Sequence, residues 1–264
     1  MTEQPTGSTP GAFRISQLWR YPVKGLSGQA LAIAHLSASA HFPGDRNYAI
    51  GGGNERVDDG IWLKKAFFLQ LMSHEALANI DCDFEMDQEC EKIILSRNGE
   101  LLLTADMKSD AGRSAVAAFF DELLQGQLPG PAKMVCLDNG AFTDTKAPLI
   151  SLGGSASITD FAGLTGTTPD SRRFRLNIIF NTTTPFEELA LVGKTLAVGD
   201  VRLDVTEPVS RCAAIDVNPE TAERGDHYLH LMENALGHTY FGIFARVTQG
   251  GTVRLGDKFS ILTY

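Results

Sequence analysis

The stretch LAVGDVRLDV, at residues 196–205, carries the clearest fold signal in this sequence of 264 residues. Apolar residues alternate with polar ones on both sides of Gly199-Asp200, a pair typical of the tight turn between two antiparallel strands. Similar short apolar runs, broken by Gly and Pro, occur at residues 13–33, and a further apolar run lies at residues 174–180. Many short strands with few helices favour a mainly β, barrel-like architecture with helices at its edges.

Other segments fit the same β-rich plan. Further strands are predicted at residues 134–137, 149–152, 241–247 and 252–262. The last two flank Gln249-Gly250-Gly251, which predicts a second hairpin. Helices are predicted at residues 66–78, 111–125, 157–164 and 228–236. The helix at 111–125 has the best pattern, because its apolar residues fall on one face and Ser109 can cap its start.

The segment GQLPGP, at residues 126–131, marks a boundary along the chain. It can neither continue a helix nor form a regular strand, since its prolines lack backbone donors and its glycines are flexible. The predicted organisation is therefore a flexible polar tail at residues 1–12, a first domain at residues 13–128 and a second domain at residues 129–264.

Composition argues against several classes of partner. The net charge of −9 disfavours nonspecific binding to nucleic acid or to anionic membranes, because both draw on an excess of Lys and Arg. No apolar run approaches the roughly 20 residues that cross a bilayer. Neither nucleic acid nor a membrane is therefore an expected partner, and the expected location is the cytoplasm.

The four cysteines, Cys82, Cys90, Cys136 and Cys212, lie far apart and form no Cys-x-x-Cys pair or metal-binding cluster in the sequence. The first three are expected to be free thiols in a reducing compartment. Cys212 differs, because it comes shortly after the 196–205 hairpin and directly follows Arg211. A thiolate is a soft metal ligand or a nucleophile, and an adjacent guanidinium favours the ionised sulfur. The alternative for an isolated cysteine is a small buried apolar side chain.

Several short motifs occur in a fixed order along the chain. They lie at residues 21–25, 44–48, 173–178, 211–212, 218–221, 241–242 and 255–257. In this order and spacing the chain resembles the MOSC proteins. MOSC names the C-terminal domain of molybdenum cofactor sulfurases, and the two-part layout is similar to the mitochondrial amidoxime-reducing components and their bacterial relatives. The resemblance implies a mainly β (α+β) fold, in which a β-rich N-terminal MOSC domain at residues 13–128 packs on a C-terminal MOSC β-barrel domain with peripheral helices at residues 129–264.

The resemblance also implies the molybdenum cofactor, which is molybdopterin with its molybdenum ion. Cys212 matches the cysteine that ligates molybdenum in the family, and would serve as metal ligand and catalytic residue. The implied cofactor-binding residues are Lys24, Arg46, Arg173, Arg175, Asn177, Arg211 and Ser155. Arginine suits phosphate and pterin carbonyls, because it can make two parallel hydrogen bonds to one group. A pyridoxal phosphate binding term also accompanies the family, and no residue of this chain is assigned to it.

The basic run at residues 173–177 is expected to lie on a strand. There Arg173, Arg175 and Asn177 would share one face, while the apolar residues between them enter the core. Taken alone, such a run is most often a solvated strand edge. Ser155 follows two glycines where a helix N-terminus could present amides and hydroxyls to an anion, although helix capping by Ser155 is equally consistent.

The chain departs from the family pattern at two places near the expected site. Gly25 stands where relatives usually carry serine after Pro-Val-Lys, so one hydroxyl contact is missing, although a glycine amide can face a phosphate at close range. Residues 218–222, NPETA, replace the usual Asp-Pro-x-Thr-Gly, which would change access to the site.

By resemblance, the expected function is that of a molybdenum-cofactor-binding oxidoreductase that reduces small N-hydroxylated compounds, such as amidoximes and hydroxylamines. The chain has no four-cysteine set for an iron–sulfur cluster, and it ends at Tyr264 without the ferredoxin-like tail of some bacterial relatives. The electrons are therefore expected from a separate electron-transfer protein, either ferredoxin-like or a flavin reductase.

Two other functions stay open from the sequence. Cys212 could carry a persulfide or an immature molybdenum cofactor to a client protein without reductase activity, or the chain could be a noncatalytic β-rich binding module. His227 and His230 suggest zinc only weakly, because no third ligand stands nearby in sequence. The lack of a Gly-x-Ser-x-Gly elbow, a Walker A loop or a Gly-x-Gly-x-x-Gly fingerprint after a strand argues against hydrolases and nucleotide-binding enzymes.

Overall fold

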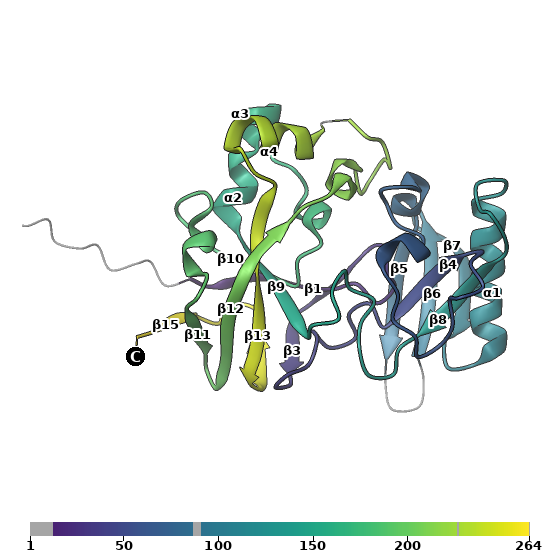
Figure 1. Cartoon of the computed structure of the whole chain (residues 1–264), viewed down its shortest axis with the longest axis horizontal. Helices are drawn as coiled ribbons and strands as arrows, with labels where there is room; N and C mark the ends of the chain where they lie inside the picture. The colour runs from purple at the N-terminus through teal and green to yellow at the C-terminus, as the bar shows by residue number, and fades with distance from the viewer. Residues whose placement is uncertain (1–12, 87–90, 226, 264) are drawn as a thin grey trace, which may run out of the picture.

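The computed structural model describes residues 13–86, 91–225 and 227–263 (Figure 1). The predicted tail at residues 1–12 and Cys90 lie outside the described residues. Strands dominate the described chain, and the α-helices are few and short, so the predicted mainly β class is confirmed. The α-helices are α1 (Asp110–Leu123), α2 (Ser155–Asp160), α3 (Ala162–Thr165) and α4 (Tyr228–Leu236). Among the described residues, no helix is long and apolar enough to cross a membrane.

The strands and short 3-10 helices have the following bounds. The strands are β1 (Ile15–Arg20), β2 (Gln29–Leu31), β3 (Ile33–Leu36), β4 (Tyr48–Gly52), β5 (Asp81–Met86), β6 (Glu91–Arg97), β7 (Glu100–Asp106), β8 (Ala132–Cys136), β9 (Leu149–Gly154), β10 (Ile178–Phe180), β11 (Thr195–Val198), β12 (Val201–Ser210), β13 (Tyr240–Gln249), β14 (Gly251–Arg254) and β15 (Ser260–Leu262). The 3-10 helices are η1 (Lys65–Phe67), η2 (Glu75–Asn79), η3 (Ser171–Phe174), η4 (Glu187–Leu191) and η5 (Ala213–Asp216).

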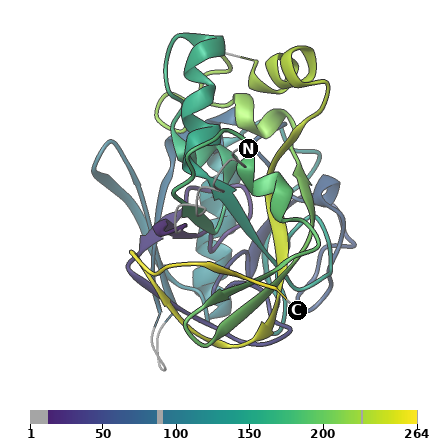
Figure 2. The ribbon, with the colours of Figure 1, turned by 90° about the vertical axis from the view of Figure 1, so that its left-hand side faces the viewer.

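The largest sheet curls into a barrel-like body with α2, α3 and α4 at one end (Figures 1 and 2). Its strand order is β15-β11-β12-β13-β9-β10-β1-β2. The sheet is closed through β3. This strand follows the edge strand β2 and pairs with β14, which precedes the other edge strand, β15. Backbone hydrogen bonds from Ile15 N to Asp257 O (2.9 Å) and from Phe259 N to Phe13 O (2.8 Å) tie β1 to the segment before β15. Inward-facing apolar residues of these strands form one buried core inside the curled sheet.

The predicted hairpin at residues 196–205 is confirmed as β11 and β12. Val198 pairs with Val201 across the two-residue turn of Gly199 and Asp200. Val201, Leu203 and Val205 point into the barrel core, while the residues between them are more exposed. This alternation is the reason that the sequence pattern located both strands.

A smaller body, which we name the α1 unit, comprises β4 to β8 and α1 (residues 48–136). The β4–β8 pair and the β5-β6-β7 sheet pack with α1 around a second buried core. Ser109 caps α1 as predicted, because its side chain accepts a hydrogen bond from Gly112 N at 3.0 Å. Val116 and Phe120 are fully buried on the apolar face of α1. In Figure 1 this unit lies beside the barrel, with α1 on its outer side.

Strand pairings cross the predicted boundary after residue 128 in both directions. β1 precedes that boundary but pairs with β10 in the barrel sheet. β8 follows the boundary but pairs with β4 in the α1 unit. The chain thus enters the barrel, leaves it for the α1 unit and returns, and the two connecting segments are residues 37–47 and 137–148.

Three local predictions are wrong. The helix predicted at residues 66–78 is two 3-10 turns, η1 and η2, because Phe68 and Leu69 run extended beside β4 and enter two different cores. The strand predicted from residue 174 begins only at β10. The hairpin predicted around residues 249–251 does not form, since β14 leaves β13 and pairs with β3. The backbone of Gly250 comes so close to Leu36 that an added Cβ would lie 2.7 Å from Leu36 O.

Glu188, in η4, is a buried carboxyl at the end of the barrel that carries the helices. It is fully buried and accepts a hydrogen bond from Ser157 Oγ at 2.7 Å. Burial raises the pKa of this carboxyl, and hydrogen bonds oppose the shift only in part. A carboxyl with a higher pKa in the folded state binds its proton more readily there, so stability is lost as the pH rises from the unfolded value through the folded one.

We therefore expect Glu188→Gln to gain stability relative to the wild type between pH 4.5 and pH 8. The size of this change grows with the difference between the folded and unfolded pKa values, because each unit of that difference corresponds to about 1.4 kcal/mol. Urea unfolding of both proteins across this range measures it. A difference that does not change with pH would show that Glu188 is not held in an unfavourable charged state.

Candidate functional site

A cavity of about 370 Å³, which we name the cleft, is lined by the outer face of the barrel sheet, by η1 and by the segment between η1 and η2. It gathers Cys212 and six of the seven predicted cofactor-binding residues, namely Lys24, Arg46, Arg173, Arg175, Asn177 and Arg211. Ser155 does not line it. Ser155 begins α2, and its side chain accepts a hydrogen bond from Thr182 N at 3.3 Å, away from the cleft.

Cys212 lies directly after β12, at the point where the backbone leaves the barrel sheet and turns into η5. It is half-buried, it is a free thiol, and it lines the cleft. The other described cysteines lie elsewhere, and burial raises the pKa of Cys82 to about 12 and that of Cys136 to about 11. Among the described cysteines, Cys212 is therefore the one that is placed to offer sulfur to a ligand in the cleft.

Arg211 holds the cysteine segment in place through backbone carbonyls. Its Nε and Nη2 donate to Phe241 O at 2.9 and 2.6 Å, and its Nη1 donates to Phe174 O at 2.7 Å. Burial lowers the pKa of Arg211 to about 10. Because these hydrogen bonds engage its guanidinium, Arg211 fixes the end of β12 against the turn that carries Arg175.

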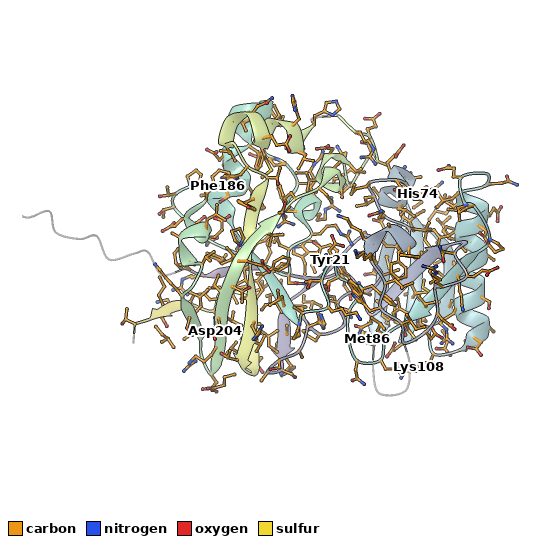
Figure 3. All side chains as sticks on the ribbon, in the orientation of Figure 1. Tyr21, His74, Met86, Lys108, Phe186 and Asp204 are labelled. Atoms are coloured by element: carbon orange, nitrogen blue, oxygen red, sulfur yellow. The ribbon has the colours of Figure 1, made fainter. Side chains whose placement is uncertain are left out.

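Two arginines enclose the ring of Tyr21, which lies between the barrel and the α1 unit (Figure 3). The guanidinium carbons of Arg46 and Arg175 lie 4.8 and 4.3 Å from the ring centroid. Arg46 forms an ion pair with Asp45, and Asp45 also accepts a hydrogen bond from Tyr21 N at 2.8 Å. Both arginines have left-handed backbones, with φ of 53° and 49°. This conformation is uncommon for residues other than glycine and is often found at functional sites.

The guanidinium of Arg175 has a nitrogen that is free to make a further hydrogen bond. Its Nη1 donates to Leu26 O at 2.7 Å, and its own carbonyl accepts from Arg46 Nη2 at 3.2 Å. Its Nη2 is buried and has no hydrogen-bond partner among the described residues. Burial, followed by the charge of Arg46, lowers the pKa of Arg175 to about 10. A buried donor without a partner is costly, so this nitrogen is suited to an acceptor supplied by a ligand.

Lys24 lines the cleft beside β4, where its backbone N donates to Tyr48 O at 2.8 Å. Its Nζ donates to Asp144 Oδ1 at 2.9 Å and to Phe142 O at 2.8 Å, while Lys65 approaches Asp144 Oδ2 at 3.5 Å. Burial lowers the pKa of Lys24, and Asp144 opposes this shift. Burial would raise the pKa of Asp144, but Lys24 and then Lys65 outweigh it and the pKa is lowered. Sequence reasoning missed Asp144 and Lys65, because no motif connects residues so far apart.

The predicted strand face of Arg173, Arg175 and Asn177 does not exist, although all three line the cleft. Arg173 lies in η3, where its Nη1 donates to Ile215 O and Asp216 O at 3.2 Å each. Arg175 ends that turn in its left-handed conformation, so the chain changes direction between them. Tertiary contacts to the segment after Cys212 thus override the alternation expected of a strand.

Asn177 ties three barrel strands together at the floor of the cleft. Its Oδ1 accepts hydrogen bonds from Ser151 N (3.1 Å) and Ser151 Oγ (2.9 Å), and its Nδ2 donates to Trp19 O at 3.3 Å. These bonds connect β9 and β1 to the residue that precedes β10. Asn177 therefore holds the floor of the cleft together, and its side-chain amide is engaged in these hydrogen bonds within the protein.

Arg224 connects the cysteine segment to the α1 unit. It closes the loop at residues 217–224, where Val217 and Arg224 form an isolated bridge. Its Nη1 donates to Ala213 O at 3.2 Å, directly after Cys212. Its Nη2 donates to the carbonyls of Leu71 and Met72, the latter at 2.8 Å, and Glu75 lies 3.5 Å away. Leu71 lines the cleft, so one guanidinium sets the spacing between two of its walls.

Charge in the cleft opposes the charge of the whole protein. The chain has a net charge of −9, whereas six cationic side chains and only two carboxylates line the cleft. The carboxylates belong to Asp144 and Glu207. An anionic group is therefore favoured in this cleft, and the arginines can hold it through hydrogen bonds to charged donors.

A metal ion in the cleft would need ligands beyond the protein. The described residues contain no group of three or more His, Cys, Asp or Glu side chains that could hold one, and the weak zinc suggestion for His227 and His230 gains no support. Cys212 can supply one sulfur, and the cations around it suit a bound anionic molecule that brings further ligands of its own.

Parts of the chain are similar to known proteins. Residues 144–260 match the MOSC domain. The chain is similar to the molybdenum cofactor sulfurase of Drosophila mojavensis, with 41% identity over 73 residues that make up 27% of this chain and 9% of that protein. For the Drosophila melanogaster protein of the same name, the identity is 38% over 92 residues, which are 34% of this chain and 12% of the relative. The chain thus spans about a tenth of the length of these curated relatives.

Two solved structures also resemble the chain at low sequence identity. The YuaD protein from Bacillus subtilis covers 97% of this chain and 98% of its own, with 11% identity and a TM-score of 0.46. YiiM from Geobacillus stearothermophilus covers 43% of this chain and 54% of its own, with 19% identity and a TM-score of 0.34. The matched residues 144–260 include Cys212 and most of the barrel strands. The chain therefore contains a MOSC domain at residues 144–260.

Proposed function

We propose that this chain binds the molybdenum cofactor in the cleft and reduces N-hydroxylated compounds. One observation carries the proposal: a free thiol at Cys212, within the segment that matches the MOSC domain, and a separate group of cations converge on a single cavity. Thiolate is a ligand suited to a soft metal centre, and cations suit the phosphate and pterin of the organic part. The sulfurase relatives are named for the same cofactor.

The residues present fit this cofactor. Cys212 would hold the metal, and Arg175, Arg46 and Lys24 would hold the anionic and pterin groups, with the partnerless Nη2 of Arg175 as a ready donor. Gly25 also fits, although relatives usually carry serine there. It has a φ of 89°, and an added Cβ would lie 2.9 Å from Leu69 O, so a side chain at this position would strain the backbone. Gly25 lines the cleft, so its backbone can approach a ligand with no side chain between them.

The cofactor, when bound, supplies a metal that exchanges two electrons and an oxygen atom with the substrate. The overall reaction takes an amidoxime, two electrons and two protons to an amidine and water. The protein residues bind and orient the reactants, and Arg211 and Arg173 hold the segments on either side of Cys212. The electrons come in this proposal from a separate ferredoxin-like protein or flavin reductase.

A second candidate is a carrier function. The relatives that match the chain are molybdenum cofactor sulfurases, and the matching segment lies within a small part of those longer proteins. Cys212 would then carry a persulfide or hold an immature cofactor for transfer to a client, and the same cations would grip it. This candidate predicts bound cofactor or labile sulfur without turnover of N-hydroxylated compounds.

One experiment separates the two. The chain is purified from a host that makes molybdenum cofactor, and bound molybdenum, pterin and labile sulfur are measured. Benzamidoxime reduction is then assayed with reduced viologen as the electron donor. Bound molybdenum together with benzamidine formation supports the reductase, bound cofactor or labile sulfur without benzamidine supports the carrier, and an empty protein contradicts both.

Arg224→Ala tests whether the spacing of the cleft walls matters for cofactor retention. We expect the variant to lose bound molybdenum about 10- to 100-fold faster during dialysis, the usual cost of removing a residue that orients a metal ligand. Arg172→Ala is the matched control, because Arg172 pairs with Asp170 and with Glu220 of the same loop and does not line the cleft. Equal retention in Arg224→Ala and wild type, at equal unfolding midpoints, would contradict this role.

A further inference from the structure

One carboxylate in the cleft is not neutralised by a neighbour. Of the two that line the cavity, Asp144 lies against Lys24 and Lys65 and is thereby paired. Glu207 is exposed, and no hydrogen bond or ion pair to its carboxylate is found in the described part of the chain. It is a free negative charge in a cavity whose other charges are mostly positive.

Strand register separates Glu207 from Asn177 and from the turn that carries Arg175. Glu207 on β12 is opposite Phe244 on β13, and Phe244 is opposite Ser151 on β9. Ser151 is hydrogen-bonded in turn to Asn177. This row crosses three strand spacings, so Glu207 and Asn177 lie roughly 14 Å apart. Arg175, two residues from Asn177, belongs to the cationic end, and Glu207 belongs to the other.

Several cleft residues next to Glu207 are apolar, and the exposed Arg246 lies two residues beyond Phe244 on the same face of β13. Phe244 lies beside it in the row, Pro208 and Val209 follow it on β12, and Leu149 lies on the same face of β9 as Ser151. An acidic group on an apolar wall suits an apolar or aromatic molecule that carries a positive charge. An anionic cofactor cannot use this end favourably, because Glu207 would repel it.

We propose that Glu207 makes the site selective for cationic N-hydroxylated substrates built on an apolar or aromatic frame. This inference rests on the proposed reductase function and names its substrate class. The cofactor occupies the end of the cleft with Arg175, Arg46 and Lys24. The substrate occupies the β12 end, where its apolar body packs on Phe244 and its positive charge meets the Glu207 carboxylate.

The test uses two probes that differ in charge and little in shape. 4-(Aminomethyl)benzamidoxime carries an ammonium group at neutral pH, and 4-ethylbenzamidoxime replaces it with a methyl group. With cofactor-loaded full chain and reduced viologen, we expect kcat/KM to favour the cationic probe roughly ten-fold, which is the scale of one hydrogen bond to a charged group. Glu207→Gln is expected to bring this ratio close to one.

Asp204→Asn is the matched control. Asp204 lies on the same strand (Figure 3), where its Oδ1 accepts a hydrogen bond from Thr195 Oγ1 at 2.7 Å, and it does not line the cleft. This variant should keep the ten-fold preference. If wild type turns over both probes with no charge preference, or if Glu207→Gln keeps the wild-type preference, the role of Glu207 is overturned and the proposed reductase function is not. Turnover of neither probe overturns the proposed function, and the substrate class with it.

Discussion

Cys212→Ser is expected to abolish benzamidoxime reduction, with a fall of at least about 100-fold in kcat. Mutating a residue that merely orients a metal ligand commonly costs 10- to 100-fold, and this change removes the proposed ligand itself. Serine keeps the size and position of the side chain but replaces a soft sulfur with a hard oxygen. Reduced viologen oxidation that depends on added substrate gives the rate.

The control for this prediction is Cys136→Ser. Cys136 is also a free thiol, but it lies on β8 in the α1 unit and outside the cleft. It should retain wild-type activity. Activity in Cys212→Ser close to that of wild type would mean that the thiol takes no part in the reaction, whatever it binds.

Arg175→Gln is expected to lower retention of the pterin roughly 100-fold, because a hydrogen bond to a charged group contributes about 1.5–3 kcal/mol and the guanidinium can make two. The cofactor-free variant should be as stable as the wild type or more stable. Burial and Arg46 already make the charged state of Arg175 unfavourable, as its lowered pKa of about 10 indicates. A variant that loses pterin but not stability is expected where a residue serves binding and destabilises the folded protein.

Arg172→Gln is the matched control for Arg175→Gln. Arg172 lies in the same turn, η3, but it pairs with Asp170 and Glu220 and does not line the cleft. Pterin content after gel filtration, read from the fluorescence of its oxidised form, measures retention, and thermal unfolding measures stability. Equal pterin loss in both variants, or a lower unfolding midpoint in Arg175→Gln, would show that the turn has a structural role only.

Local sequence signals located the elements whose structure is locally determined. The β11–β12 hairpin follows from alternation about a Gly-Asp turn, and α1 follows from its apolar face and its Ser109 cap. The turn that carries Arg175 was predicted to be a strand, because its real shape depends on Arg211, which binds Phe174 O from a distance of 37 residues. No periodicity within residues 173–177 could reveal that contact.

The candidate site was predictable in part for the same reason. Resemblance to MOSC proteins named Cys212 and the arginines one motif at a time, and the cleft brings them together. Asp144, Lys65 and Arg224 were not found, because each acts through a partner distant in the sequence. Ser155 was named from a glycine-rich helix start, which is a weak signal, and it lies outside the cleft.

In the proposed site, Cys212 holds the metal while separate cations hold the organic part of the cofactor. Molybdenum and pterin contents of wild type and Cys212→Ser, measured on the same purified samples, test it most directly. We expect about one molybdenum per pterin in the wild type, and much less molybdenum per pterin in the variant, which keeps its pterin through Arg175, Arg46 and Lys24. An equal molybdenum-to-pterin ratio in the two proteins would contradict it.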